Sequence, residues 1–228
     1  MAYNLMESRR RILWESGRVR LPNTYQEVRY IDNLGEAHIN TGIYPEDNVD
    51  VDLLVKYMPI VVGSNYILTS RNGSNGTSTG FVGSQSTGGI NFRWGVDTTS
   101  YANSSITRVS GHVYTQHGIV SGGVGTLYVT DETTGNADVM TFPVSSLPSD
   151  LVTFKLCAAN MSGGSSQYQI CKRVRVYAAH IIKNGEYVMN FVPCYRKSDG
   201  LAGMYDLARQ AFYPSTRSSY PFEAGPSV

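Results

Sequence analysis

The sequence has little charge and no long apolar run. Asp, Glu, Lys and Arg make up 16% of the 228 residues, and the formal net charge is +1. A chain with so little charge offers no general attractive field to nucleic acid. No stretch reaches the roughly 18 apolar residues that a membrane-spanning helix needs. We therefore expect neither nucleic-acid binding nor membrane insertion.

Cysteine is also scarce. The three cysteines, Cys157, Cys171 and Cys194, are spaced in a way that matches no zinc or redox motif. Two of them lie in apolar, strand-like surroundings, where a free thiol behaves as a small hydrophobic residue. His112 and His117 are five residues apart in a predicted strand, so they point to opposite faces and do not share a metal. We predict reduced cysteines, no metal and no cofactor.

The chain does contain abundant material for strands and turns, including 23 glycines and 16 tyrosines. In 49–57, apolar residues alternate with Asp50, Asp52 and Lys56, which is the pattern of a half-buried antiparallel strand. Asn184-Gly185 between two apolar runs predicts a type I′ hairpin. Many short strands joined by turns, without helical crossovers, predict an all-β fold, an antiparallel two-sheet β-sandwich or jelly roll.

Residues 1–20 differ from this body because they hold five arginines against two glutamates. Apolar residues recur there at a spacing of two helical turns, and Gly17 suits a C-cap, so we predict a short N-terminal amphipathic α-helix. A helix of about fourteen residues is marginal alone in water and must dock on its own domain or on another chain. Arg9-Arg10-Arg11 stands where a secretory signal needs apolar residues, so we expect no export by that route. We divide the chain into an anchoring segment, 1–20, and a sandwich domain, 21–228.

Patterns that suggest catalysis are weak. GTSTG at 76–80 matches the elbow of serine hydrolases, but the residues after it indicate strand and loop where that elbow needs a helix. Asp50 and Asp52 share a strand face about 7 Å apart, yet alternating aspartates on a wet face are ordinary solvation. Cys194 lies in VPCYRKSDGLAGMYDL, a predicted hairpin with no histidine or helix N-terminus nearby to lower a thiol pKa. We predict no catalytic residue and a chain that is not an enzyme.

Three aromatic residues are candidates for ligand contact. Trp94, Tyr66 and Tyr101 lie in or beside predicted loops and strand edges, where flat rings can stack on sugars or on a neighbouring subunit. Tyrosine also suits strands, so a place in the core is the alternative for each ring.

Two segments that frame the body resemble a known family. TYQEVRYIDNLGEAHINTGIYP at 24–45, EYVMNFVPCYRKSDGLAGMYDLARQAFYPS at 186–215 and FEAGP at 222–226 are similar to LamG-like, concanavalin A-like domains of bacteriophage virion proteins. The resemblance implies two curved antiparallel sheets in which the first and last strands are adjacent. It also implies a place on the virus particle, in a tail, baseplate or head fibre. One departure is 216–221, which replaces the glycine-rich turn before the closing strand.

Three functional hypotheses follow. The first is a phage structural protein, located in the virion as a homotrimer or other symmetric oligomer. It would bind other virion proteins through an N-terminal anchor that consists of Leu5, Met6, Arg9, Arg10, Arg11, Ile12 and Leu13. The second is a lectin-like module that binds host-surface carbohydrate. The third, a glycoside hydrolase, needs two carboxylates about 5 to 9.5 Å apart in a groove, and no pair stands out in the sequence.

Overall fold

The computed structural model of the chain describes residues 21–47, 49–61, 66–71, 78–83, 88–96, 99–147, 152–160, 168–171 and 173–228. Within these ranges the regular elements are β-strands and none is a helix. The predicted all-β, antiparallel two-sheet sandwich is therefore confirmed. The predicted N-terminal helix and all the residues of the predicted anchor lie outside the described residues.

The larger sheet has eleven strands, and a path of eight runs in the order β11-β10-β9-β4-β15-β16-β17-β18. Their bounds are β4 (Val51–Pro59), β9 (Tyr114–Ser121), β10 (Val124–Asp131), β11 (Asn136–Pro143), β15 (Val174–Lys183), β16 (Glu186–Arg196), β17 (Ala202–Asp206) and β18 (Ala211–Pro214). Three short strands pair beside this path: β1 (Tyr25–Glu27), β2 (Ile31–Asn33) and β19 (Glu223–Ala224).

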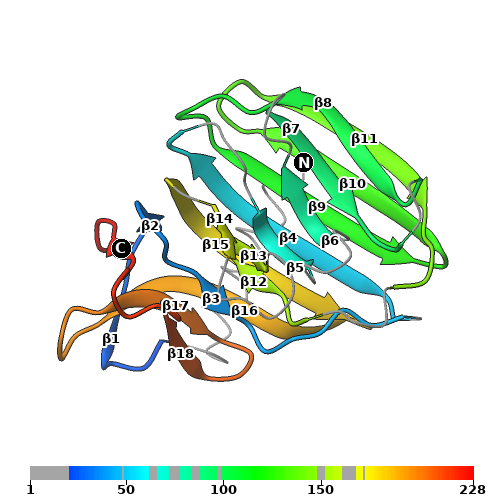
Figure 1. The fold of residues 1–228 in the computed structure, drawn as a ribbon. Coiled ribbons are helices and arrows are strands. Elements are labelled where there is room, and N and C mark those ends of the chain that lie inside the picture. The colour runs from blue at the N-terminus through cyan, green and yellow to red at the C-terminus, as the bar shows by residue number, and fades with distance from the viewer. Residues whose placement is uncertain are drawn as a thin grey trace.

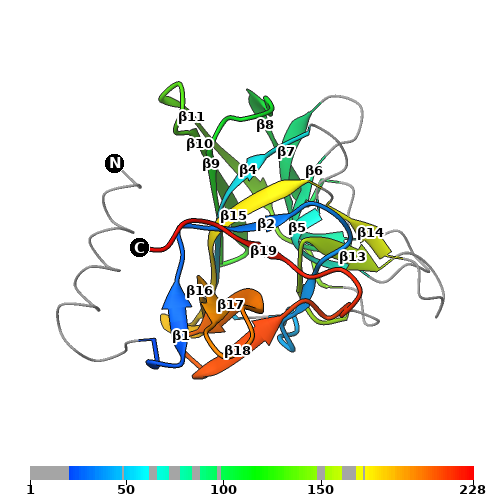
Figure 2. The same ribbon diagram turned by 90° about the vertical axis from the view of Figure 1, so that its left-hand side faces the viewer.

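The smaller sheet has six strands in the order β3-β12-β5-β6-β7-β8. They are β3 (Ile39–Asn40), β12 (Lys155–Leu156), β5 (Tyr66–Arg71), β6 (Ser78–Gly83), β7 (Gly89–Arg93) and β8 (Tyr101–Thr107). A separate hairpin pairs β13 (Ala158–Asn160) with β14 (Tyr168–Ile170). Figures 1 and 2 show the sheets as two layers, with β1, β16, β17 and β18 gathered at the lower end in both views.

Aromatic rings from both sheets fill the space between the layers. Phe92 on β7 contacts Phe81, Trp94 and Phe142, with ring centroids 5.3, 6.2 and 5.7 Å away. Gly118 on β9 makes room for this cluster, since a β-carbon there would lie 2.7 Å from Cζ of Phe92. The strand that faces the cluster therefore needs glycine for packing at this position.

The two sheets are also tied together along one side by Asp138 of β11. One carboxylate oxygen of Asp138 accepts hydrogen bonds from the backbone N–H and the hydroxyl of Ser105 on β8, both at 2.7 Å, and from the Ser104 hydroxyl at 3.1 Å. These hydrogen bonds lower the pKa of Asp138, with the Ser105 hydroxyl as the largest cause. The charged carboxylate thus fastens the end strand of one sheet to the end strand of the other.

The segments that resemble the phage family meet in space. β1 pairs with β16, β19 pairs with β2, and a bridge joins Val28 to Ser227. The N-terminal and C-terminal segments therefore lie side by side, with β2 and not β1 as the partner of the last strand. The departing segment 216–221 is held near β3, where the Thr216 N–H donates to the carbonyl of His38 at 2.7 Å.

Candidate functional site

The candidate site lies on the outer face of the larger sheet, the face turned away from the smaller sheet. In β4 the residues Val51, Leu53, Val55 and Tyr57 belong to the core between the layers. Side chains alternate along a strand, so Asp50 and Asp52 belong to the opposite, outer face. Strand register then decides which residues stand beside them.

Asp52 is held by a histidine from the neighbouring strand. Nε2 of His117 on β9 lies 2.7 Å from Oδ1 of Asp52, and both side chains remain partly exposed. The His117 ring stacks on Tyr128 of β10 with ring centroids 5.5 Å apart and an interplanar angle of 29°. Tyr128 is 37% exposed, so part of its ring faces water. A carboxylate, an imidazole and a phenol thus form one continuous row across three strands.

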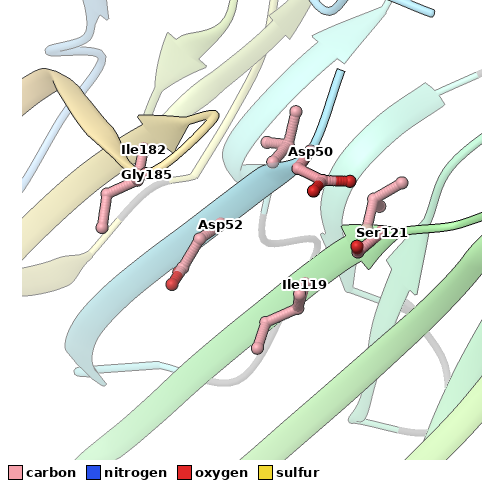
Figure 3. Close-up of a pocket in the computed structure, with 8 residues that line it drawn as sticks. Asp50, Asp52, Ile119, Ser121, Ile182 and Gly185 are labelled. Carbon is pink, nitrogen blue, oxygen red and sulfur yellow. The ribbon is translucent and has the colours of Figure 1, made fainter. Parts of the chain in front are cut away.

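A shallow hollow of about 350 Å³ adjoins this row. Figure 3 shows Asp50, the residue before β4, and Asp52 of β4 beside Ile119 and Ser121 of β9, with Ile182 and Gly185 from the β15–β16 hairpin on the other side. Asp52 is directly opposite Ile119 on one side and Ile182 on the other. Carboxylates at the rim and isoleucines in the wall make the hollow amphipathic.

The β15–β16 turn forms one rim of the hollow. Asn184 and Gly185 have φ values of 49° and 82°, as the predicted type I′ turn requires. The Asn184 N–H donates to the Asp50 carbonyl at 2.9 Å, and the Asn184 side-chain oxygen accepts from the Asp50 N–H at 3.2 Å. The backbone of Asp50 is therefore fixed while its side chain is exposed.

Other charges near these strands neutralise one another. Lys56 pairs with Glu132 at 2.8 Å, Arg175 with Asp32 at 2.8 Å, and Lys183 with Glu46 at 2.6 Å. Within the part of the chain that the structure describes, Asp50 forms no ion pair. Its carboxylate is therefore available to accept hydrogen bonds from a ligand.

This arrangement suits a ligand with hydroxyl groups and apolar ring faces. The carboxylates of Asp50 and Asp52 and the Ser121 hydroxyl can bind hydroxyl groups, and the ring of Tyr128 offers a flat apolar surface. Because the hollow is open and shallow, it fits part of an extended chain better than an enclosed small molecule.

The three aromatic residues predicted from the sequence are not brought together. Trp94 is 1% exposed and packs against Phe92 and Phe154, so we correct its assignment from ligand contact to core. Tyr66 is also buried, and its hydroxyl accepts a hydrogen bond from Arg71 at 2.8 Å. Tyr101 is 42% exposed on β8, in the smaller sheet, away from the hollow.

The sequence reasoning missed Tyr128, His117 and the role of the two aspartates. Tyr128 stands between Leu127 and Val129, which are both buried, so the alternation places an aromatic ring on the wet face. That signal was present in the sequence. The register that aligns Tyr128 with His117 and Asp52 could not be predicted from the local sequence, because it depends on the pairing of β4, β9 and β10.

The other patterns in the sequence behave as structural features. All three cysteines are free and buried, and burial raises the pKa of Cys157 and of Cys194 to about 12. The hairpin tip after Cys194 is closed by an Arg196–Asp199 ion pair. GTSTG leads into strand β6, as predicted, and not into a helix.

The described residues contain no group of three or more His, Cys, Asp or Glu that could hold a metal ion. No helix among them is long and apolar enough to cross a membrane.

No family model matches the chain, and no curated protein sequence matches it. Several solved structures are similar in fold. The enzymatically active domain of tailspike protein 2 from bacteriophage CBA120 is 11% identical over 73% of this chain and 30% of that one, with a TM-score of 0.41. Scytalido-glutamic peptidase is 15% identical over 86% and 98% of the two chains, with a TM-score of 0.41. Peanut lectin is 12% identical over 72% and 94%, with a TM-score of 0.38.

At these values the likeness concerns the fold alone. The similar structures include concanavalin A-like jelly-roll sandwiches. The finer assignment, to LamG-like domains of phage virion proteins, stays a prediction.

The prediction that the chain is not an enzyme is contradicted by these comparisons. A peptidase and a tailspike domain described as enzymatically active are among the similar structures. The lack of a recognised catalytic motif was insufficient ground for the exclusion. We withdraw it.

Proposed function

We propose that this chain is a bacteriophage virion component whose β-sandwich binds carbohydrate on the host surface. The binding face is the outer face of the larger sheet, at the hollow beside Asp50 and Asp52 and at the Tyr128–His117 stack. Residues 1–20 anchor the chain to other virion proteins, and 21–228 form the displayed domain.

The observation that carries the carbohydrate proposal is the combination of groups around the hollow. A sugar ring has hydroxyl groups on its edge and C–H groups on its faces. Asp50 is exposed without an ion pair among the described residues, while Tyr128 presents a partly exposed ring one strand beyond His117. Hydrogen bonds to carboxylates and stacking on an aromatic ring together match both parts of such a ligand.

The virion placement has separate support. It depends on the framing segments 24–45, 186–215 and 222–226, which resemble phage virion domains and pair with one another in the structure. The basic, amphipathic pattern of residues 1–20 fits an anchor that docks on another chain.

A glycan array tests the binding proposal directly. The full chain is screened against bacterial surface polysaccharides, together with Asp50→Asn at the hollow and Asp199→Asn at the distant hairpin tip. We expect saturable binding that Asp50→Asn weakens and Asp199→Asn leaves unchanged. No saturable binding to any glycan, or an equal loss in both variants, would contradict the proposal.

The same polysaccharides also show whether the site only binds its ligand or also cleaves it. After incubation with the protein, a bound polysaccharide of unchanged length indicates recognition alone. Release of reducing ends, lost in Asp50→Asn or Asp52→Asn, would assign hydrolysis to the hollow.

Electron microscopy of intact particles with a gold-labelled antibody tests the virion location, and absence of label from every particle would contradict it.

A further inference from the structure

Strand β11 forms one end of the larger sheet and pairs on one side only. Its partner is β10, from Asp131 opposite Asn136 to Val124 opposite Pro143. Within the part of the chain that the structure describes, no strand pairs with its other side. A strand of eight residues therefore presents an open edge.

The preceding hairpin determines which backbone groups point outward. Gly122 and Gly123 have φ values of 56° and 78° and form a two-residue turn between Ser121 and Val124. In such a turn the two flanking residues, here Ser121 and Val124, exchange both backbone hydrogen bonds. Because this pattern alternates along antiparallel strands, every second residue of β10 counted from Val124 bonds to β9, and the residues between them bond to β11. By that alternation Asn136, Asp138, Met140 and Phe142 bond to β10. The N–H and C=O groups of Ala137, Val139 and Thr141 are directed to the open edge.

This edge lacks the features that usually prevent strands from pairing. Native edges are guarded by lysines, prolines, bulges or very short strands. Between Asn136 and Phe142 there is no Lys, Arg, Glu or Pro, and the one proline of β11, Pro143, is its last residue. The only charge is Asp138, and Ser104 and Ser105 of β8 hold it toward the smaller sheet. Val139, in the middle of the edge, is 57% exposed.

The other strands at the ends of the two sheets are less suited to pairing with a further strand. β3 has two residues and β18 has four. On β8 the backbone N–H of Ser105 already donates to Asp138. β11 is thus the best strand in the described part of the chain for adding another strand.

We propose that β11 pairs antiparallel with β11 of a second copy of this chain, about a two-fold axis at Val139. The two Val139 residues then face each other, and Ala137 lies opposite Thr141 of the second copy. This register aligns the outward backbone groups and forms about six hydrogen bonds. A second copy fits because the pairing is self-complementary and places Asp138 opposite Met140 of the second copy, so that no two like charges are directly opposite each other.

The pairing does not depend on carbohydrate binding, but it affects that function. The two larger sheets become one continuous sheet, and Tyr128 of each copy lies one strand from the joint. Both copies of Tyr128 then lie on the same face, about 14 Å apart if the strands keep their usual spacing. A polysaccharide could contact both sites of the dimer, which increases its overall affinity without any new contact.

Sedimentation of the full chain, with matched edge variants, tests the pairing. Val139→Lys places a cation on the edge, and Thr141→Pro removes an N–H that a lone copy does not use. Val124→Lys is the control, because Val124 is a similarly exposed valine on β10 whose backbone bonds to β9. We expect a dimer in the unmodified chain, at least tenfold weaker association in both edge variants, and an unchanged dimer in the control.

Hydrogen exchange makes the test specific to the edge. The amide of Val139 should exchange at least tenfold more slowly at high protein concentration than under dilution, while the amide of Asp138 stays protected in both. A monomer at millimolar concentration, a trimer, or a dimer that Thr141→Pro leaves intact would overturn the proposal. Protection of Val139 in the particle but not in the isolated chain would overturn it too, and would assign the edge to another virion protein.

Discussion

The two faces of β4, β9 and β10 come from alternate residues of the same strands and differ sharply in character. The inward side chains are fully buried, among them Tyr57, Tyr114 and Leu127. The outward ones keep polar atoms at the surface, as Asp52, His117 and Tyr128 do. One face holds the two layers together, and the other is free to bind. Substitutions should therefore affect either stability or recognition, depending on the face.

The largest effect is expected for Trp94, a candidate for ligand contact in the sequence that the structure places in the core. Trp94→Ala should lower the free energy of unfolding by about 3 to 5 kcal/mol, because it leaves a cavity among Phe92, Phe154 and their neighbours. Tyr101→Ala, on the exposed side of β8, should cost well under half of that. Urea unfolding of both variants measures the difference, and equal losses would contradict the assignment of Trp94 to the core.

A smaller effect is expected where β9 passes beneath the aromatic cluster. Gly118→Ala puts a methyl group into contact with the Phe92 ring, so the free energy of unfolding should fall by about 1 to 3 kcal/mol. Ser121→Ala, exposed on the same strand, should change it by less than about 0.5 kcal/mol. If thermal or urea unfolding shows Gly118→Ala to be neutral, the two sheets are less closely packed here than we describe.

The link between β8 and β11 should depend on pH. Hydrogen bonds from Ser105 lower the pKa of Asp138 below its ordinary value, so the charged form stabilises the fold. That contribution is fully present above pH of about 5, shrinks as pH falls below about 3.9, and is lost below the lowered pKa. The stability difference between the unmodified chain and Asp138→Asn should follow this curve. A difference that does not change between pH 6 and pH 3 would show that Asp138 makes no such link.

The smallest effect is expected at the thiols. Burial raises the pKa of Cys157 and Cys194 to about 12, so neither forms an appreciable thiolate at pH 8. An aromatic disulfide reagent should label neither in the folded chain and all three cysteines after unfolding. Rapid labelling of Cys194 in the folded chain would show that the hairpin around it opens.

Much of the fold could be predicted from local patterns. The alternation in 49–57 predicted β4, and Asn184-Gly185 predicted the turn between β15 and β16. Both signals depend on neighbours in the sequence. Strand β8 was not predicted, because its Ser and Asn residues are equally typical of turns.

The site was harder to predict, because it depends on register between distant segments. Asp52 and His117 are 65 residues apart and meet only when β4 pairs with β9. Considered singly, Asp52 is explained as a solvated aspartate and His117 as a surface histidine. The choice between ligand contact and core was left open for Trp94, since nothing in the local sequence shows that Phe154 packs against its ring.

The most direct test of the central claim is the affinity of the full chain for its best array glycan, measured by titration calorimetry. Tyr128→Ala removes the ring on the proposed binding face, and Tyr101→Ala removes a similarly exposed ring on the other sheet. We predict at least tenfold weaker binding for Tyr128→Ala, about 1.4 kcal/mol, and unchanged binding for Tyr101→Ala. Unchanged binding in Tyr128→Ala, with the fold intact, would contradict the account.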